Sequence, residues 1–369
     1  MSILFQPMKI RSMELRNRFV RSATCDCLAD GTGHVSEKQI KIFVELAKGG
    51  VGLIVTGIAY VHHSGQILTN QNSIAGDDCI AGFKKLTANV HDQGGKVALQ
   101  LFHGGRDRAE FLRGKNEQAI APSFIQNDPY FTEEYRSMTQ DEIWDIIGAF
   151  GDGAKRAGEA GFDAVQLHAA HAFLPSQFLS PYTNRRSDEW GGSLENRLRF
   201  HREIYQDIRA KVGADYPVLI KLGVQDGFPG GLEFSEGKQA ARLLSQWGYD
   251  ALEISQGLRG EWYEGTEFRS KIDCLDREGY FRNWCKEVKS EVNVPTIMVG
   301  GLRTFELMEE VIEKCEADFV SLSRPLIKEP GIINEWKSGN RHGATCISCN
   351  MCLEALRDGE ELQCKQQAS

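Results

Sequence analysis

The sequence predicts an α/β fold in which eight parallel strands close into a (βα)₈ TIM barrel. Short apolar runs rich in β-branched residues alternate with amphipathic helical patterns over roughly 300 residues. Nearly continuous apolar strands are typical of a parallel sheet that is buried on both faces. No Gly-x-Gly-x-x-Gly motif follows an early strand, which argues against a doubly wound sheet. We therefore expect one barrel domain over residues 1–339 and a short cysteine-rich tail over 340–369.

The predicted strands and helices alternate along the whole barrel. The first helix begins at Ser36, which together with Gln39 has the spacing of a capping box, and Thr139 with Glu142 has the same spacing before a later helix. The predicted strands cover residues 19–25, 52–60, 96–102, 163–168, 218–222, 251–255, 296–299 and 319–322. The predicted helices cover residues 36–49, 81–93, 141–161, 195–212, 235–247, 280–292 and 305–315.

Charge and hydropathy exclude some classes of partner. The chain has 51 acidic and 43 basic residues, a formal charge of −8, and no run of five or six basic residues, so a nucleic-acid partner is not expected. Its apolar runs are far shorter than the roughly 18 residues that a membrane span needs. Residues 1–11 lack the basic and apolar regions of a signal peptide, so we expect a cytoplasmic protein.

Polar and glycine residues gather where the predicted strands end. In a (βα)₈ barrel the carboxyl ends of the strands and the loops that follow them form the active face. The third strand carries Gln100, the fourth is followed by His171 after His168, and the fifth carries Lys221. The seventh strand is followed by Gly300 and Gly301, and the eighth by Ser323 and Arg324.

The last two strand ends predict a phosphate site. A phosphate in such a barrel commonly lies between the loops after strands seven and eight. Gly301 would allow close approach of backbone N–H groups, and Arg324 would supply a bidentate charge. A double glycine alone is equally typical of a plain turn, so the pairing with Arg324 is what favours the phosphate.

His168, His171 and Lys221 allow several interpretations. The two histidines would ligate a metal, be satisfied core residues, or donate hydrogen bonds to a substrate oxygen; no third ligand is evident, which makes a metal the weakest of the three. A lysine inside a barrel strand needs an anion or a reactive carbonyl beside it, because an unpaired buried charge is costly.

Together these residues resemble the old yellow enzyme family of FMN-dependent ene-reductases, in the bacterial branch that includes the barrel domain of 2,4-dienoyl-CoA reductase. The resemblance covers nearly the whole chain. Its motifs are Asn17-Arg18, Gln100, His103-Gly104-Gly105-Arg106, the His168 to His171 motif, residues 178–181 and the long string over residues 188–197.

The resemblance implies an FMN site in the mouth of the barrel. The phosphate would lie on Gly301 and Arg324, beside Gly300 and Ser323, and the pyrimidine edge of the flavin on Gln100. Lys221 would lie near N1 and O2, where the reduced flavin carries negative charge. Backbone at Ala23, Thr24 and Gly57 would lie against the ring. Cys25 would contact the flavin and tune its potential, or be only a small buried hydrophobe.

The resemblance also implies a reaction, with one departure from the family. NAD(P)H would reduce the flavin, and His168 and His171 would then polarise the carbonyl of an unsaturated small-molecule substrate. Family members usually carry a proton-donating tyrosine two residues after the second histidine, where this chain has Phe173. The proton would then come from Tyr182, Tyr263, Cys27 or water, unless the reaction is not a simple alkene reduction.

The tail contains four closely spaced cysteines: Cys346, Cys349, Cys352 and Cys364. They resemble the [4Fe–4S] ligand run that follows the barrel in the dienoyl-CoA reductase branch, although the gap between Cys349 and Cys352 is one residue shorter. Zinc and an unligated remnant are the alternatives. Because the sequence ends five residues after Cys364, a separate electron-donor protein is the partner that a cluster would imply.

Two other functions remain open from the sequence alone. A Schiff-base aldolase would also use a barrel lysine, here Lys221, and a phosphate site at Gly301 and Arg324. A non-catalytic flavin-binding redox partner would explain Phe173 and the cysteine tail. The identity of the alkene, the choice between NADH and NADPH, and whether the chain forms a homo-oligomer are not decided by any pattern in the sequence.

Overall fold

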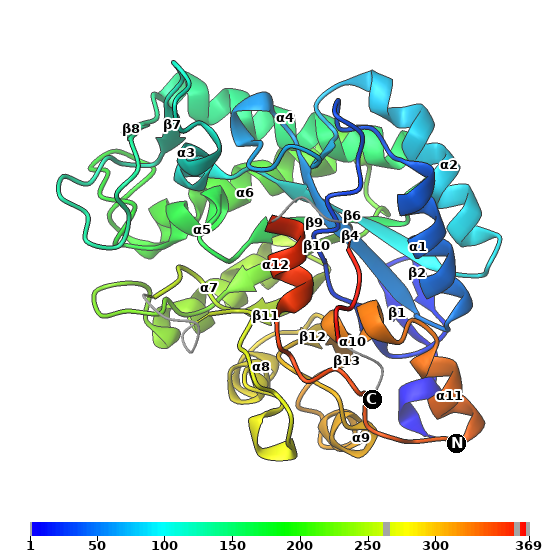
Figure 1. The fold of residues 1–369 in the computed structure, drawn as a ribbon. Coiled ribbons are helices and arrows are strands. Elements are labelled where there is room, and N and C mark those ends of the chain that lie inside the picture. Colours follow the sequence, from blue (N-terminus) through cyan, green and yellow to red (C-terminus); the bar gives the residue numbers. More distant parts are fainter. Residues whose placement is uncertain (1, 261–265, 358–361, 367–369) are drawn as a thin grey trace.

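A computed structural model describes residues 2–260, 266–357 and 362–366. Within these residues, eight parallel strands form a closed barrel, because β13 pairs with β3 and β3 pairs with β4 (Figure 1). The barrel strands are β3 (Phe19–Arg21), β4 (Leu53–Tyr60), β6 (Lys96–Phe102), β9 (Ala164–Ala169), β10 (Val218–Gly223), β11 (Ala251–Ser255), β12 (Thr296–Met298) and β13 (Phe319–Leu322). The predicted (βα)₈ TIM barrel is confirmed.

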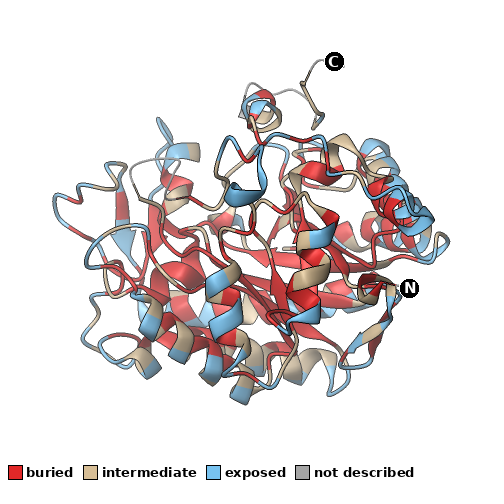
Figure 2. Ribbon diagram, turned by 90° about the horizontal axis from the view of Figure 1, so that it is seen from below, coloured by how far each residue is buried: buried red, intermediate tan, exposed pale blue. Residues whose placement is uncertain are grey.

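Helices surround the barrel, and their outer faces are exposed while the strands are buried (Figures 1 and 2). The helices between barrel strands include α1 (Glu37–Lys48), α2 (Ile80–His91), α4 (Gln140–Glu159), α6 (Leu194–Val212), α7 (Phe234–Trp247), α8 (Arg282–Lys289) and α9 (Phe305–Glu313). After β13 come α10 (Arg324–Lys328), α11 (Ile332–Ser338) and α12 (Met351–Arg357). None of the helices in the described ranges has the length and hydropathy of a membrane span.

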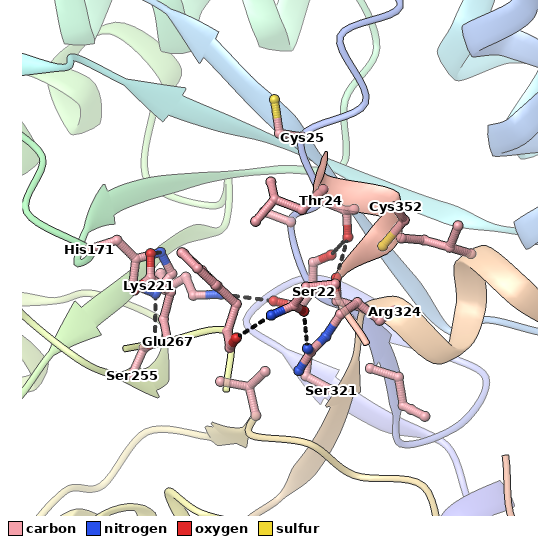
Figure 3. Close-up of a pocket in the computed structure, with 18 of the residues that line it drawn as sticks. Ser22, Thr24, Cys25, His171, Lys221, Ser255, Glu267, Ser321, Arg324 and Cys352 are labelled. Carbon is pink, nitrogen blue, oxygen red and sulfur yellow. Dashed lines mark hydrogen bonds and ion pairs between the residues drawn. The ribbon is translucent and has the colours of Figure 1, made fainter. Parts of the chain in front are cut away.

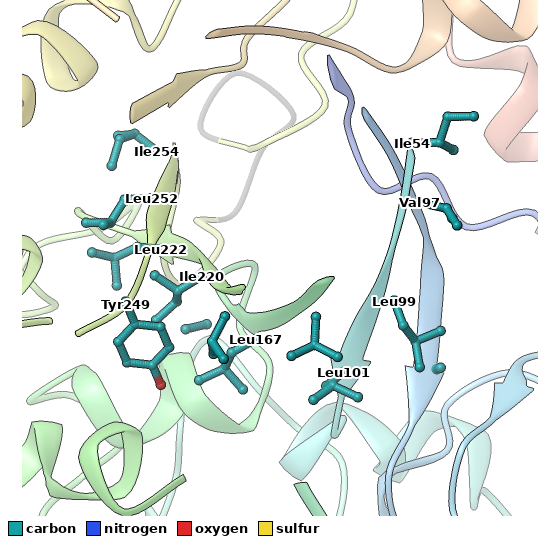
Figure 4. Packing of buried hydrophobic residues seen from close by; sticks show 14 of the residues in the cluster. Ile54, Val97, Leu99, Leu101, Leu167, Ile220, Leu222, Tyr249, Leu252 and Ile254 are labelled. Carbon is teal, nitrogen blue, oxygen red and sulfur yellow. The ribbon is translucent and has the colours of Figure 1, made fainter. Parts of the chain in front are cut away.

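Alternation along each strand divides the apolar side chains between two cores. Leu99 and Leu101 on β6 belong to the large core between strands and helices, as do Leu167, Ile220 and Leu222 (Figure 4). Ala98, which directly precedes Leu99, points to the opposite side and belongs to the core inside the barrel. These apolar strands form because both of their faces are covered.

A hairpin closes one end of the barrel. It consists of β1 (Met8–Ile10) and β2 (Met13–Leu15), which pair antiparallel. Its buried side chains Ile10, Met13 and Leu15 pack against the side chains that the barrel strands contribute to the interior. This end carries the amino termini of the strands, so the opposite end, formed by their carboxyl termini, is left for a site.

The structure corrects several predicted boundaries and one predicted cap. The first strand ends at Arg21, so residues 22–25 belong to the following loop. Thr139 and Glu142 form the predicted capping box. Ser36 caps its helix, but the side chain of Gln39 bonds to Asp26 and Asn72. Sequence patterns did not reveal the short elements α3 (Arg108–Phe111), β7 (Ala119–Ala121), β8 (Tyr135–Ser137) and α5 (Leu174–Leu179).

Candidate active site at the carboxyl ends of the strands

A cavity of about 400 Å³ lies at the carboxyl ends of the barrel strands (Figure 3). The structure brings most of the predicted site residues to it: Ala23, Thr24, Cys25, Gln100, His168, His171, Lys221, Gly301, Ser323 and Arg324. Gly57 and Gly300 do not line it. Gly57 lies behind the cavity wall, where a Cβ would come within 3.0 Å of the carbonyl oxygen of Thr24. Strand ends far apart in the sequence therefore form one site.

Lys221 is held by a buried carboxylate on the neighbouring strand. Lys221 on β10 is paired in register with Glu253 on β11, so both side chains point into the barrel. The Nζ of Lys221 lies 3.3 Å from Oε1 of Glu253 and donates a hydrogen bond of 2.8 Å to the hydroxyl of Ser22. Ser22 in turn donates to Glu253 at 2.7 Å. The lysine thus has the anion that its burial requires.

Sequence reasoning missed Glu253, although a signal was present. The strand reads Ala-Leu-Glu-Ile-Ser, and a carboxylate in the middle of such an apolar strand needs a cation or several donors. Its other carboxylate oxygen accepts a hydrogen bond of 3.0 Å from Nε2 of Gln166. A lysine and a glutamate each inside apolar strands would have predicted this pair.

Gln100 has an unused acceptor in the cavity wall. Its Nε2 donates a hydrogen bond of 2.8 Å to Oε1 of Gln166, which fixes the orientation of the amide. Its Oε1 is buried and has no hydrogen-bond partner within the described part of the chain. A buried oxygen of this kind is normally satisfied, so a ligand with an N–H group suits this position.

His168 and His171 lie side by side as neutral rings. Their ring centroids are 4.9 Å apart, and Nε2 of His171 lies 2.7 Å from the hydroxyl of Ser255. Burial, and then the positive charges of Lys221 and Arg259, hold the pKa of His168 well below its usual value. The pKa of His171 is also well below its usual value, mainly through burial. Neutral imidazoles can donate one hydrogen bond each to a substrate oxygen.

The backbone after β9 is strained where it presents His171. His171 has a φ of 59° and Ala172 a φ of 68°, in the left-handed region that non-glycine residues seldom adopt. Backbone hydrogen bonds from His171 to Gln256 (3.0 Å) and from Ala172 to Gly257 (3.2 Å) hold this conformation. Strained conformations that the surroundings enforce are typical of functional sites.

Phe173 occupies the cavity wall beside the histidines. Its ring packs edge-on against Phe102 at 4.5 Å and His168 at 4.9 Å, and the guanidinium carbon of Arg259 lies 5.3 Å from its centroid. Arg259 forms ion pairs with Glu267 (2.9 Å) and Asp107 (3.2 Å). Sequence reasoning missed Arg259 and Glu267, which lie in a loop without a pattern.

Two of the other candidate proton donors, Tyr182 and Cys27, do not line the cavity. The hydroxyl of Tyr182 donates to Asp128 at 2.7 Å, and burial raises its pKa to about 12; Tyr182 does not line the cavity. Cys27 does not line it either. Tyr263 lies outside the described residues.

Arg303 and Arg324 line the far end of the cavity together with Gly301, and Arg269 contacts Arg324. Arg324 donates to the carbonyl of Arg269 at 2.8 Å and to Oδ1 of Asn350 at 2.5 Å. Arg269 and Arg303 each have a buried Nε without a hydrogen-bond partner in the ranges that the structure describes. Arg303, which sequence reasoning missed, lines the cavity with Arg324 and Gly301. This arrangement suits a phosphate.

The tail forms part of the cavity wall. Ser348, Asn350 and Cys352 line the cavity, and Asn350 donates to the carbonyl of Phe268 at 3.0 Å. All four tail cysteines line a second, much smaller pocket: Cys346, Cys349, Cys352 and Cys364. In the described ranges, no group of three or more histidine, cysteine or acidic side chains could hold a single metal ion. The metal site stays a prediction.

Comparison with known proteins agrees with this site. Residues 3–342 match the NADH:flavin oxidoreductase / NADH oxidase family. The chain is 36% identical over 354 residues to the NADH oxidase of Thermoanaerobacter brockii, covering 94% of this chain and 53% of that protein. It is 33% identical over 387 residues to the cinnamate reductase of Clostridium sporogenes, covering 98% of this chain and 57% of that protein.

Solved structures show the same relationship. A 2-naphthoyl-CoA reductase in complex with 2-naphthoyl-CoA superposes with a TM-score of 0.90 at 26% identity, covering 98% of this chain and 56% of that chain. The chain therefore spans little more than half the length of these relatives. As the resemblance to old yellow enzyme predicted, the chain belongs to the NADH:flavin oxidoreductase / NADH oxidase family.

Proposed function

We propose that this chain uses FMN to transfer hydride from NAD(P)H to an activated C=C bond of an unsaturated carbonyl compound. The observation that carries this proposal is the pair of neutral histidines, His168 and His171, in one cavity with Gln100 and Lys221. Relatives named cinnamate reductase and 2-naphthoyl-CoA reductase support a substrate whose double bond is conjugated with a carboxyl or acyl group.

The residues of the cavity fit FMN. Arg324, Arg303 and Gly301 would hold the phosphate, and the unpartnered Oε1 of Gln100 would accept from an N–H of the flavin pyrimidine. Lys221, fixed by Glu253 and Ser22, would face negative charge on the ring. FMN, when bound, supplies the hydride-transfer chemistry.

The histidine pair would bind and orient the substrate. Both rings are neutral because burial lowers the pKa values of His168 and His171, so each can donate one N–H to the substrate carbonyl. Donors fixed at the carbonyl oxygen would withdraw electron density from the conjugated double bond and make its β-carbon electrophilic. Ser255, at 2.7 Å from Nε2 of His171, would hold that ring in place.

We also propose that the tail cysteines ligate a [4Fe–4S] cluster, with zinc as the less favoured alternative. Four thiols around one pocket have the number and softness that such a cluster requires. A separate electron-donor protein and a cytoplasmic location remain expectations from the sequence, and the oligomeric state stays open.

The Schiff-base alternative is disfavoured by the surroundings of Lys221. Its Nζ donates a hydrogen bond to Ser22 and forms an ion pair with Glu253, so this nitrogen is already held by protein groups. Family membership also favours flavin chemistry. The non-catalytic alternative predicts no NAD(P)H oxidation by the flavin-loaded protein, so the experiment below separates it from the enzyme.

The two half-reactions test the proposed function. In anaerobic stopped-flow measurements, a His168→Ala/His171→Ala variant should be reduced by NAD(P)H within about twofold of the wild-type rate. Its reoxidation by an enone should slow by about 10²–10³-fold, the usual effect of losing oriented donors. The long-wavelength band that phenols give on stacking against the flavin should vanish. His91→Ala, a variant of a half-exposed histidine on α2, is the matched control. Equal loss of both half-reactions in an FMN-loaded variant would refute the role in carbonyl binding.

A further inference from the structure

Cys25 and Cys27 form a close pair of thiols in the loop after β3. Their sulfur atoms are 3.5 Å apart, in hydrogen-bond contact. The chain turns sharply here, because Cys27 has a φ of 50°, in the left-handed region. Both cysteines are reduced and only partly buried. This pairing is not required by the fold, since neither side chain belongs to a hydrophobic core cluster.

The residue between them anchors the turn. Asp26 is buried, and its carboxylate accepts hydrogen bonds from Nε2 of Gln39 on α1 and from the backbone N–H of Leu28, all at 3.1 Å. These bonds hold the middle residue of the turn in place. Asp26 therefore fixes the conformation that keeps the two flanking thiols together.

The two thiols differ in acidity. The hydrogen bond with Cys25 lowers the pKa of Cys27, whereas the same bond and burial raise the pKa of Cys25 well above its usual value. Cys27 is therefore the sulfur that ionises first, with the S–H of Cys25 donating to it. A thiolate is the nucleophile in thiol oxidation, and a second thiol in contact can resolve the first product.

The pair is also placed where a small oxidant arrives. Cys25 lines the cavity, and Figure 3 shows its sulfur at the edge of the site that holds Thr24 and Lys221. In the proposed function, on which this step rests, reoxidation by dioxygen would release hydrogen peroxide in the same cavity. One relative of the chain is named NADH oxidase, and this name supports a reaction with dioxygen at the site.

We propose that Cys25 and Cys27 are a dithiol redox site beside the cavity, which peroxide oxidises reversibly to an intramolecular disulfide. The thiolate of Cys27 attacks the peroxide, the O–O bond breaks, and a sulfenic acid and hydroxide form. Cys25 gives its proton to the hydroxide and attacks the sulfenic sulfur, releasing a second hydroxide that takes up a proton. In sum, two thiols and one hydrogen peroxide give one disulfide and two waters; the sulfurs lose two electrons and the peroxide oxygens gain them.

Closure of the disulfide would change the cavity wall. The sulfurs must approach from 3.5 Å to the covalent distance of about 2.0 Å, which draws the sulfur of Cys25 toward Cys27. It also removes both S–H groups of the pair as possible hydrogen-bond donors. A flavin in contact with Cys25 should therefore report the oxidation state of the pair.

Peptide mass spectrometry tests the proposal directly. Trypsin cleaves after Arg21 and Lys38, and the peptide over residues 22–38 contains Cys25 and Cys27 as its only cysteines. After treatment of the full-length protein with hydrogen peroxide, this peptide should lose both alkylation sites and become lighter by two hydrogen atoms. Dithiothreitol should restore both sites. The proposal is wrong if both sites remain alkylatable when the exposed Cys315 is already oxidised, or if the peptide gains only oxygen.

Single variants identify the order of attack. Cys25→Ser should let peroxide convert Cys27 to a sulfenic acid that dimedone traps, whereas Cys27→Ser should leave Cys25 alkylatable. Cys315→Ser, which changes an exposed and distant thiol, is the matched control and should behave as wild type. Oxidation of Cys25 in Cys27→Ser at the wild-type rate would overturn the assignment of Cys27 as the attacking sulfur.

The same experiment on flavin-free protein separates this proposal from the proposed function. The disulfide should form with or without FMN, because the turn and Asp26 belong to the chain alone. In FMN-loaded protein, peroxide should also shift the flavin absorption band, and dithiothreitol should reverse the shift; Cys27→Ser should show no shift. A disulfide without any flavin shift would refute the contact between Cys25 and FMN but not the dithiol site.

Discussion

Phe173 is the position at which one hydroxyl group should alter the proposed reaction most. The ring is fixed by Phe102 at 4.5 Å, by His168 at 4.9 Å and by Arg259, whose guanidinium lies 5.3 Å from the ring centroid. A tyrosine in the same orientation would have its ring held by the same contacts, and the positive charge of Arg259 would lower the pKa of its hydroxyl. A positioned general acid typically contributes about 10²–10⁴-fold. We expect Phe173→Tyr to accelerate turnover of simple cyclic enones by about 10²-fold, at the lower end of this range.

The measurement separates hydride transfer from protonation. Reoxidation of the reduced protein by cyclohexenone and by a nitroalkene is followed in H₂O and D₂O. Wild type should be reoxidised faster by the nitroalkene, because the nitroalkene adduct persists until solvent protonates it. Phe173→Tyr should be reoxidised faster than wild type by the enone only. Phe173→Leu, which adds no hydroxyl, is the control and should show no gain. Rapid enone reduction by wild type, with no faster reduction in Phe173→Tyr, would refute the reasoning and point to another proton donor, to be sought among Cys27, Tyr182 and Tyr263.

Three further predictions concern the phosphate end, a buried histidine and the tail. Arg324→Ala should weaken FMN retention by about 10- to 100-fold in dialysis, because a charge-assisted contact is worth about 1.5–3 kcal/mol, while Lys328→Ala on the same short helix should not. His201 is fully buried and its pKa is lowered to about 3, so the unfolded chain binds more protons between pH 6.5 and 3 and stability falls as pH falls. Between pH 7.5 and 5.5, the free energy of unfolding measured in urea should therefore fall by about 1.4 kcal/mol less in His201→Leu than in wild type. An equal fall in both proteins would contradict the lowered pKa of His201. Anaerobically purified protein should show broad iron–sulfide absorption that Cys364→Ser removes; wild type without iron but with one zinc per chain would favour the alternative.

The barrel could be predicted because its signals are local and repeated. Each apolar strand and amphipathic helix reflects the same need to bury two faces of one sheet, and the position of a residue at a strand end already places it on the active face. This is why His168, Lys221 and Arg324 could be assigned to one cavity before their distances were known. The boundaries were less certain, since β3 ends at Arg21 and the loop after it depends on contacts with α1.

The rest of the site depends on contacts between segments that share no pattern. Arg259 and Glu267 reach the cavity from one irregular loop, and their ion pair with each other is visible only in three dimensions.

The tail is the clearest case. Its cysteine spacing predicts metal ligation, but the sequence does not indicate that Asn350 would accept a hydrogen bond from Arg324 and so join the tail to the phosphate end. Cys352 lines both the main cavity and the small cysteine pocket. A group bound by the tail would therefore share a wall with a group bound in the barrel, and loss of either should disturb the other. Removing FMN and measuring how fast a chelator extracts metal from the tail would test this coupling. Faster extraction is expected, and an unchanged rate would mean that the two sites are not coupled through the shared wall.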